Sequence, residues 1–551
     1  MSDGRRDFLK KTTMLVAGAQ AGAVLPFLSQ AGRAAPAKEP GNGSVVTDTT
    51  DGKVRGVDSG GVKIFKGIPY GASTAGKNRF MPPTKPAKWA GVRDATEFGH
   101  ISPQTLVTNP GDYEKAIEWD KEKGGLSEDC LNLNVWTPSV KSGAKLPVLV
   151  QYHGGGFTTG SGNLPGYDGE AMARWANVVI VNVNHRLGAL GYTYLGDLAG
   201  PEFAYSGVAG MMDCVAALQW VHDNVANFGG NPENVFIFGQ SGGGAKTSVL
   251  LSMASAKSLF HRAAVQSGST LRLAHHDAAT KNAEQLLAEL GLDKGRIGEL
   301  QNVPFEKIVE AQAALGRHTP PVGFAPSVDG KIIPRDPFDP TAPDVSATVP
   351  MLVSTTLEDA ALRMNDWDIT EDGLRSWVQK TYGDRADRIL TTYRRAYPQV
   401  RPFLIKARIA TDSGGRRNAT TMAERKAAEG GAPVYLYRWD FPSPAYGGKF
   451  GAIHGMDVSL ALHNPVPPLA GNTPETKTMA EKLSSVWLAF AKTGDPNNKA
   501  IPHWPRYNAD QRPTMIFDLN TRVENDPAHD IRLLWDEVRT TESRAATEPR
   551  A

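Results

Sequence analysis

Short runs of β-branched and aromatic residues recur along the chain, each bounded by glycine, proline or charged residues. Residues 146–152 and 178–184 have the composition of parallel strands that are buried on both faces. Residues 131–136 alternate between apolar and polar side chains, which predicts a half-buried strand. Further strands are predicted at 234–238, 263–266, 351–355, 434–439 and 515–517.

Helical patterns separate these runs. Residues 211–228 form one such pattern and stop at Gly229, and residues 246–253 form another. Near the C-terminus, Gly494 ends a helix whose apolar face consists of Met479, Leu483, Val486, Trp487 and Phe490. Strands alternating with helices predict an α/β fold with a mostly parallel sheet covered on both faces. Because no repeat or linker divides the pattern, we expect a single domain over residues 45–540.

The first 37 residues differ from the rest. Arg5 and Arg6 precede Phe8 and a weakly apolar stretch at 14–28, a pattern typical of a cleaved twin-arginine signal peptide. The stretch is too short and too rich in glycine to span about 30 Å of hydrocarbon. Cleavage after Ala34 and cleavage after Ala37 both fit. We therefore expect export by the twin-arginine (Tat) machinery to the bacterial periplasm or beyond, without a stable membrane anchor.

The overall charge argues against a nucleic-acid-binding protein. The chain has 60 Lys and Arg against 58 Asp and Glu, a net charge of +2, and no basic run. Hydrophobic residues make up 40%, as in ordinary globular enzymes. The two cysteines, Cys130 and Cys214, allow one disulfide, but we interpret them as buried core thiols.

Residues 239–243 (GQSGG) lie between a predicted strand and a predicted helix, the context in which a G-x-S-x-G motif forms a nucleophile elbow. Gly239 and Gly243 would remove Cβ atoms that collide in so tight a turn, and Ser241 would be exposed above the sheet. A glycine-rich capping loop is one alternative. A phosphate-binding P-loop is another, but Ala245 separates Gly244 from Lys246, where that motif requires the lysine to follow directly.

Residues 153–157 (HGGGF) follow the predicted strand 146–152. Consecutive glycines let backbone N–H groups approach a carbonyl oxygen on which negative charge develops. We predict an oxyanion hole formed by the N–H groups of Gly155, Gly156 and Gly242, and we expect His153 to be structural.

A serine nucleophile needs a histidine base and a carboxylate that orients it. His454 lies in a loop of small residues, 451–455 (GAIHG), after a predicted strand. Glu358 and Asp359 follow the end of strand 351–355, at the expected position of the acid.

With these motifs, the chain resembles the type-B carboxylesterase/lipase family from about residue 45 to 518. The resemblance rests on residues 65–70 (FKGIPY), 127–134 (SEDCLNLN), 153–157, 239–243, 266–268 (QSG), 451–455 and 490–497 (FAKTGDPN). It implies an α/β-hydrolase fold with long loop insertions over the active site, and ester hydrolysis without a metal or organic cofactor.

The resemblance also implies roles for single residues. An ungapped match places Asp359 at the catalytic acid, with Glu358 as the alternative. Ser102 stands where the family has the cysteine that pairs with Cys130, so the family's first disulfide is predicted to be missing. Ser267 resembles a buried serine that hydrogen-bonds within the triad network. Trp119 resembles an aromatic platform for cations, but it is offset by one residue, and we expect ordinary packing.

We therefore expect a serine carboxylesterase acting on small-molecule esters through an acyl-enzyme, with the triad Ser241, Asp359 and His454. Hydrolysis of amides or carbamates by the same residues is an alternative. A non-catalytic binding protein on this scaffold is a second alternative, although no triad member is lost. Loops at 101–126, 318–345 and 402–450 are expected to line the substrate gorge.

Overall fold

The computed structural model describes residues 43–547, and the predicted signal peptide lies outside this range. A large sheet runs through the described chain in the order β1-β2-β3-β5-β7-β6-β8-β9-β12-β13-β14-β15, with β4 on β2. Its strands are β1 (Ser44–Thr49), β2 (Gly52–Ser59), β3 (Val62–Pro69), β4 (Val92–Asp94), β5 (Asn132–Thr137), β6 (Leu146–Tyr152), β7 (Val179–Val183), β8 (Gly230–Gln240), β9 (Arg262–Gln266), β12 (Met351–Thr356), β13 (Val434–Trp439), β14 (Pro513–Phe517) and β15 (Arg522–Asn525). A separate parallel pair joins β10 (Ala274–His275) to β11 (Ser327–Val328).

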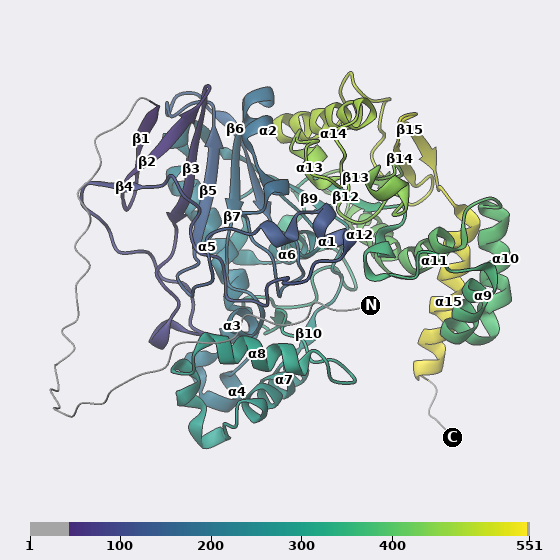
Figure 1. The fold of residues 1–551 in the computed structure, drawn as a ribbon, viewed down its shortest axis with the longest axis horizontal. Helices are drawn as coiled ribbons and strands as arrows, with labels where there is room; N and C mark the ends of the chain where they lie inside the picture. The colour runs from purple at the N-terminus through teal and green to yellow at the C-terminus, as the bar shows by residue number, and fades with distance from the viewer. Residues whose placement is uncertain (1–42, 548–551) are drawn as a thin grey trace, which may run out of the picture. The chain divides into compact units, whose positions relative to one another are not determined.

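The centre of the sheet is parallel, as the alternating pattern predicts. Strands β7, β6, β8, β9, β12, β13 and β14 pair in parallel, whereas β1, β2, β3 and β5 at one edge and β15 at the other pair antiparallel. In Figure 1 the antiparallel strands β1, β2, β3 and β5 lie at one side, and the later parallel strands lead toward β15 and the C-terminal helices at the other.

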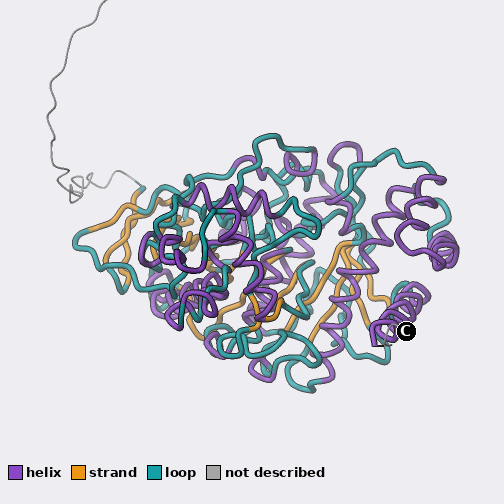
Figure 2. Tube along the Cα trace, turned by 90° about the horizontal axis from the view of Figure 1, so that it is seen from below, coloured by secondary structure: helices purple, strands orange, loops and turns teal. Residues whose placement is uncertain are grey.

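Helices cover both faces of the sheet, and Figure 2 shows the strands passing between them. They are α1 (Asp112–Ala116), α2 (Glu170–Ala176), α3 (Gly188–Tyr192), α4 (Gly196–Ala199), α5 (Ala209–Asn224), α6 (Gly242–Leu250), α7 (His276–Glu289), α8 (Phe305–Leu315), α9 (Glu371–Tyr382), α10 (Ala386–Ala396), α11 (Pro402–Thr411), α12 (Arg417–Ala428), α13 (Val458–Ala461), α14 (Pro474–Thr493) and α15 (His529–Thr547). Among the described helices, none combines the length and the apolarity needed to cross a bilayer.

Strand β6 shows how the two faces divide. Val148 and Val150 belong to a core with residues of α5, whereas Leu149 points the other way into a core with residues of α14. Successive side chains of a strand point to opposite faces, so a strand covered on both sides has an unbroken apolar run. The predicted α/β fold with helices on both faces is confirmed.

The prediction of a half-buried strand at residues 131–136 was wrong. All six residues of β5 are buried, because both faces of the strand are covered: Leu133 and Val135 pack in one core and Trp136 in the other. Its polar positions bond to protein rather than to water: the Asn134 amide donates to Asn163 at 3.0 Å, and the Asn132 amide donates to the His100 carbonyl at 2.7 Å. Alternation here reflects a buried amide network.

Both cysteines are buried free thiols, as predicted. Burial raises the pKa of the Cys130 thiol, and a hydrogen bond with the Ser102 side chain partly offsets this effect. Ser102 therefore does stand beside Cys130, where a disulfide partner would be. Cys214 packs in the core between helix α5 and the sheet.

Candidate active site

The predicted elbow is the turn between β8 and α6. Ser241 has φ 58° and ψ −123°, a strained conformation for a residue with a Cβ. A Cβ added at Gly243 would lie 2.0 Å from the backbone carbonyl oxygen of Tyr152, and one at Gly239 would lie 2.4 Å from the carbonyl carbon of Gly243. Only glycine fits at these two positions, as the motif predicts, because the obstructing atoms are backbone.

The three predicted oxyanion donors lie together. Gly155 and Gly156 have φ of 85° and 63°, in the left-handed region that favours glycine. A Cβ at Gly242 would lie 2.4 Å from the Gly156 nitrogen, so the elbow and the glycine loop touch. Within the described residues, the Gly155 and Gly156 N–H groups have no intramolecular acceptor. Both donors are available to an oxygen placed between the loop and the elbow.

The structure brings His454 and Asp359 together. His454 Nδ1 is hydrogen-bonded to Asp359 Oδ1, and the two residues are only 9% and 8% exposed. Since the carboxylate accepts, Nδ1 carries the proton and Nε2 is left as the acceptor. The His454 loop lies against the elbow, since a Cβ at Gly455 would be 3.9 Å from the Gln240 amide. No hydrogen bond joins His454 to Ser241 among the described contacts.

Glu358, the alternative acid, is engaged elsewhere. Its carboxylate pairs with Arg408, which donates at 2.7 Å through Nε, and it accepts the Ala452 N–H at 2.8 Å. The Glu358 N–H in turn donates to the Ala452 carbonyl at 3.1 Å. Glu358 thus ties the acid turn to the backbone two residues before His454, while Asp359 contacts the imidazole itself.

Asp457, which the sequence analysis missed, is fully buried and lies close enough to Asp359 for their charges to interact. It accepts a hydrogen bond of 2.7 Å from the Tyr437 hydroxyl, to which the Gln266 amide donates at 3.2 Å. Burial raises the pKa of Asp457, and the nearby Asp359 raises it further. Its hydrogen-bond partner Tyr437 lies 20 residues away in sequence, on β13, so no local pattern marks Asp457.

The hydrogen bond that the resemblance implied for Ser267 is not found within residues 43–547. There Ser267 Oγ is buried without a partner, and its φ of 47° is unusual for a serine. The next residue, Gly268, packs against the elbow, because a Cβ added to it would lie 2.2 Å from the backbone carbonyl oxygen of Ser241.

His153 and Trp119 have packing roles, as expected. The His153 ring stacks on His185 with centroids 4.8 Å apart, and its Nδ1 donates to the Gly154 carbonyl at 2.9 Å. Burial holds the pKa of His153 well below its usual range, so the ring is neutral. Trp119 packs beside Leu164 and Tyr167.

A small apolar cavity of about 50 Å³ lies beside the elbow. Its lining includes Gln240 of β8, Gly455 of the histidine loop and three aromatic residues, Tyr113, Trp119 and Tyr167. Of the three segments expected to line the substrate gorge, 101–126 contributes to this cavity, whereas 318–345 and 402–450 do not.

The prediction that 402–450 is a loop was wrong, because α11, α12 and β13 occupy most of it.

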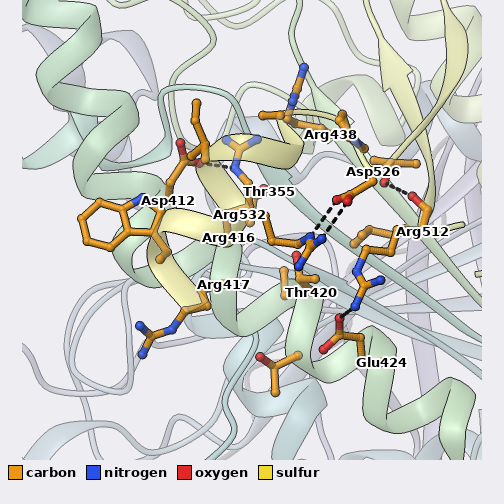
Figure 3. A pocket seen from close by; sticks show the side chains of 18 of the residues that line it. Thr355, Asp412, Arg416, Arg417, Thr420, Glu424, Arg438, Arg512, Asp526 and Arg532 are labelled. Atoms are coloured by element: carbon orange, nitrogen blue, oxygen red, sulfur yellow. Dashed lines mark hydrogen bonds and ion pairs between the residues drawn. The ribbon is translucent and has the colours of Figure 1, made fainter. Parts of the chain in front are cut away.

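A second cavity of about 90 Å³ is rich in arginine and lies among α12, β13, β14 and α15 (Figure 3). Four of its five arginines are paired with carboxylates: Arg416 with Asp412, Arg438 with Asp440, Arg512 with Glu424 and Arg532 with Asp526. None of the predicted site residues lines it. We interpret it as a structural network of ion pairs.

Comparison with known proteins identifies the group to which this arrangement belongs. The carboxylesterase family matches residues 43–533. The para-nitrobenzyl esterase of Bacillus subtilis is 33% identical over 500 residues, covering 88% of this chain and 97% of the relative. Phenmedipham hydrolase of Pseudarthrobacter oxydans is 32% identical over 506 residues, covering 88% of this chain and 97% of the relative.

Solved structures agree with this result. The Geobacillus stearothermophilus carboxylesterase EST55 superimposes with a TM-score of 0.77 at 35% identity, covering 89% of this chain and 99% of its own. An esterase from Clostridium hathewayi superimposes with a TM-score of 0.78 at 33% identity, covering 90% of this chain and 98% of its own. The chain therefore belongs to the carboxylesterase family, and it is a serine carboxylic ester hydrolase with the α/β-hydrolase fold.

Proposed function

We propose that Ser241, His454 and Asp359 form the catalytic triad, and that Gly155, Gly156 and Gly242 form the oxyanion hole. The hydrogen bond between His454 and Asp359, on a loop that touches the elbow, carries this proposal. With Nδ1 of His454 bonded to Asp359, Nε2 is left to act as the base toward Ser241.

The reaction proceeds in two halves. Ser241 Oγ attacks the ester carbonyl as His454 Nε2 takes its proton, and the carbonyl oxygen becomes an oxyanion facing the three N–H groups. Collapse expels the alcohol, which receives the proton from His454, and leaves an acyl-enzyme. Water, deprotonated by His454, then attacks the acyl carbon. The bond to Ser241 Oγ breaks, Oγ takes the proton back from His454, and the acid is released. The chemistry needs no cofactor.

A serine-directed fluorophosphonate probe tests the assignment of the nucleophile. We expect stoichiometric labelling of Ser241, located by peptide mass spectrometry, and none in Ser241→Ala. Labelling at another serine, or a Ser241→Ala variant that keeps full activity, would defeat the assignment. An unlabelled but folded wild type would favour a non-catalytic binding protein.

Para-nitrophenyl esters of graded acyl length, with a para-nitroanilide control, test the bond that is cleaved. We expect the esters to turn over far faster than the anilide, because para-nitrophenolate leaves without the protonation that the anilide nitrogen requires. Preference for the anilide would instead favour amide hydrolysis. A carbamate ester added to the panel tests whether the enzyme hydrolyses carbamates.

We further propose that residues 1–37 are a twin-arginine signal and that residues 45–540 act as one domain in the periplasm or outside the cell. The paired arginines before a weakly apolar stretch support this proposal. Replacing Arg5 and Arg6 by Lys should retain a full-length precursor in the cytoplasm. Export of this variant at the wild-type rate would contradict the proposal.

A further inference from the structure

Lys246, the near miss to a P-loop lysine, lies on α6 behind the glycine loop and is 0% exposed. Its Nζ donates to the carbonyl of Gly156 at 2.8 Å and to that of His153 at 3.1 Å. It also lies 5.6 Å from the centre of the Phe157 ring. The side chain therefore ends inside the loop that carries two predicted oxyanion donors.

No carboxylate pairs with Lys246 within residues 43–547. The titratable groups that face it are the neutral imidazoles of His153 and His185 and the buried thiol of Cys214. Burial lowers the pKa of Lys246 to about 7. An uncompensated lysine in a core is costly, and such costs are concentrated at functional sites.

The two bonds clamp the peptide units on either side of the donors. The N–H groups of Gly155 and Gly156 belong to the peptides 154–155 and 155–156. The carbonyls that Lys246 holds belong to the flanking peptides 153–154 and 156–157. Because Gly155 and Gly156 both have positive φ and little steric restriction, the direction of their N–H groups depends on such external contacts.

We propose that Lys246 is a positioning residue of the oxyanion hole, which holds the backbone of residues 153–157 so that the Gly155 and Gly156 N–H groups face the reacting oxygen. This inference rests on the proposed function. A donor fixed before reaction needs no reorganisation when charge develops, so the effect belongs to the transition state.

The test is Lys246→Met, which keeps the length of the side chain and removes the donors. We expect kcat on para-nitrophenyl esters to fall roughly 10- to 100-fold, less than or comparable to the loss of one oxyanion donor, with KM changed less than about threefold. An alkyl trifluoromethyl ketone, which forms a hemiketal oxyanion with Ser241, should lose affinity by the same factor. The matching alkyl methyl carbinol, an alcohol that binds without forming an oxyanion, should keep its affinity.

Lys426→Met is the matched control. Lys426 is also 0% exposed and donates to two backbone carbonyls, of Ser346 at 2.8 Å and Ala347 at 3.0 Å, but it lies on α12 and pairs with Glu429. Its replacement should lower stability and leave kcat unchanged. If Lys246→Met does not fold, Lys246→Gln, which keeps N–H donors on a shorter side chain, is measured in the same assays.

A folded Lys246 variant with wild-type kcat and ketone affinity would overturn the inference. An equal loss of affinity for the ketone and the alcohol would overturn it as well, because that result indicates general damage to the pocket. Failure of the proposed function is distinct, since the wild type itself would then neither form the hemiketal nor react with the phosphonate at Ser241.

Discussion

Two adjacent carboxylates at the end of β12 have different surroundings, although they have the same charge. Asp359 contacts the imidazole of His454, and Glu358 is paired with Arg408 and with the backbone of the histidine loop. Backbone position explains the difference, because Glu358 forms a β-bridge with Ile453 of the histidine loop, whereas Asp359 begins the 3-10 helix that follows. The two residues should therefore affect different measurable quantities.

Asp359→Asn should lower kcat by about 10³- to 10⁴-fold, because an amide does not fix the tautomer of His454 or stabilise its cation. Folding should be retained, since asparagine is isosteric with aspartate. Steady-state kinetics with a para-nitrophenyl ester measures the effect, and circular dichroism checks the fold.

Glu358→Gln provides the comparison. It leaves Arg408 without its buried partner, so we expect a loss of stability of about 3–5 kcal/mol and a much smaller effect on kcat. If the Gln variant lost more activity than the Asn variant, the two carboxylates would have exchanged roles.

Lys246 predicts a dependence of stability on pH. Its pKa is about 7 in the folded protein against 10.5 ordinarily, so the folded state binds fewer protons than the unfolded state between these values. The contribution of Lys246 to the free energy of unfolding therefore rises with pH across this window, by up to about 1.4 kcal/mol per pH unit. We expect urea unfolding to show that the free energy of unfolding of the wild type, relative to that of Lys246→Met, is higher at pH 9 than at pH 7. A constant difference would contradict the lowered pKa.

The elements around the elbow pack backbone against backbone. The end of β8, the start of α6, the glycine loop after β6 and the turn after β9 meet with no room for a Cβ. Contacts of this kind fix atomic positions more firmly than side-chain contacts do, because a backbone cannot choose another rotamer.

Gly243→Ala tests this packing. The added Cβ would lie 2.0 Å from the backbone carbonyl oxygen of Tyr152, so β6 or α6 must move. We expect an unstable protein or a folded one with kcat reduced at least 100-fold, because displacement of about 1 Å costs that much. The matched control is Gly414→Ala, where no atom lies within 4 Å of the added Cβ and activity should be unchanged. An active and stable Gly243→Ala variant would show that the turn is more adaptable than its contacts indicate.

The elements that sequence patterns predicted well are those with a local signature. The strands at residues 146–152 and 434–439 have the predicted bounds, since a short run rich in apolar, β-branched and aromatic residues marks a strand covered on both faces. The elbow and the glycine loop were found because a tight turn permits few residue types. The helix ending at Gly494 was found for the same reason: its cap has φ 77°.

Features that depend on distant contacts escaped prediction. In the sequence Asp457 looks like any aspartate, because its partner Tyr437 lies on β13 and only the fold brings the two together. The buried amides of Asn132 and Asn134 suggested exposure to water because their partners lie on other segments. Helices α11 and α12 were taken for a loop, since α11 is buried along most of its length and lacks a clear polar face.

Across the described chain, the C-terminal helix is linked to the acid turn. Trp535 Nε1 donates to the Tyr393 hydroxyl at 3.0 Å, which donates to Asp412 at 2.7 Å. Asp412 pairs with Arg416, whose guanidinium donates to the carbonyls of Thr356 and Leu357 at 3.0 and 3.1 Å. Figure 3 shows part of this network beside the arginine-rich cavity.

Trp535→Ala should reduce stability by about 3–5 kcal/mol, because it removes a large side chain that is 3% exposed. We expect kcat to change less than about threefold well below the melting temperature, since the Thr411 hydroxyl also accepts from the Ala360 N–H at 2.9 Å and keeps the turn in place. Leu533→Ala, 46% exposed on the same helix, is the control and should be nearly neutral. A large loss of kcat would show that α15 contributes to the alignment of the acid.

Ser102→Cys should form a disulfide with Cys130, because the two side chains are in contact. Closing a loop of about 28 residues is expected to stabilise the protein by about 3–4 kcal/mol. Melting temperatures with and without dithiothreitol, and a thiol count on unfolded protein, measure the effect, with Ser102→Ala as the unbridged control. Two free thiols besides that of Cys214 would mean that the bond had not formed.

The unpaired state of Cys130 and Cys214 has a consequence for how the enzyme is made. Because no disulfide has to form, the polypeptide needs neither an oxidant nor a disulfide isomerase to reach its active state. It should fold as readily in a reducing bacterial cytosol as outside it, and reducing agents such as dithiothreitol in a storage buffer should leave its activity intact.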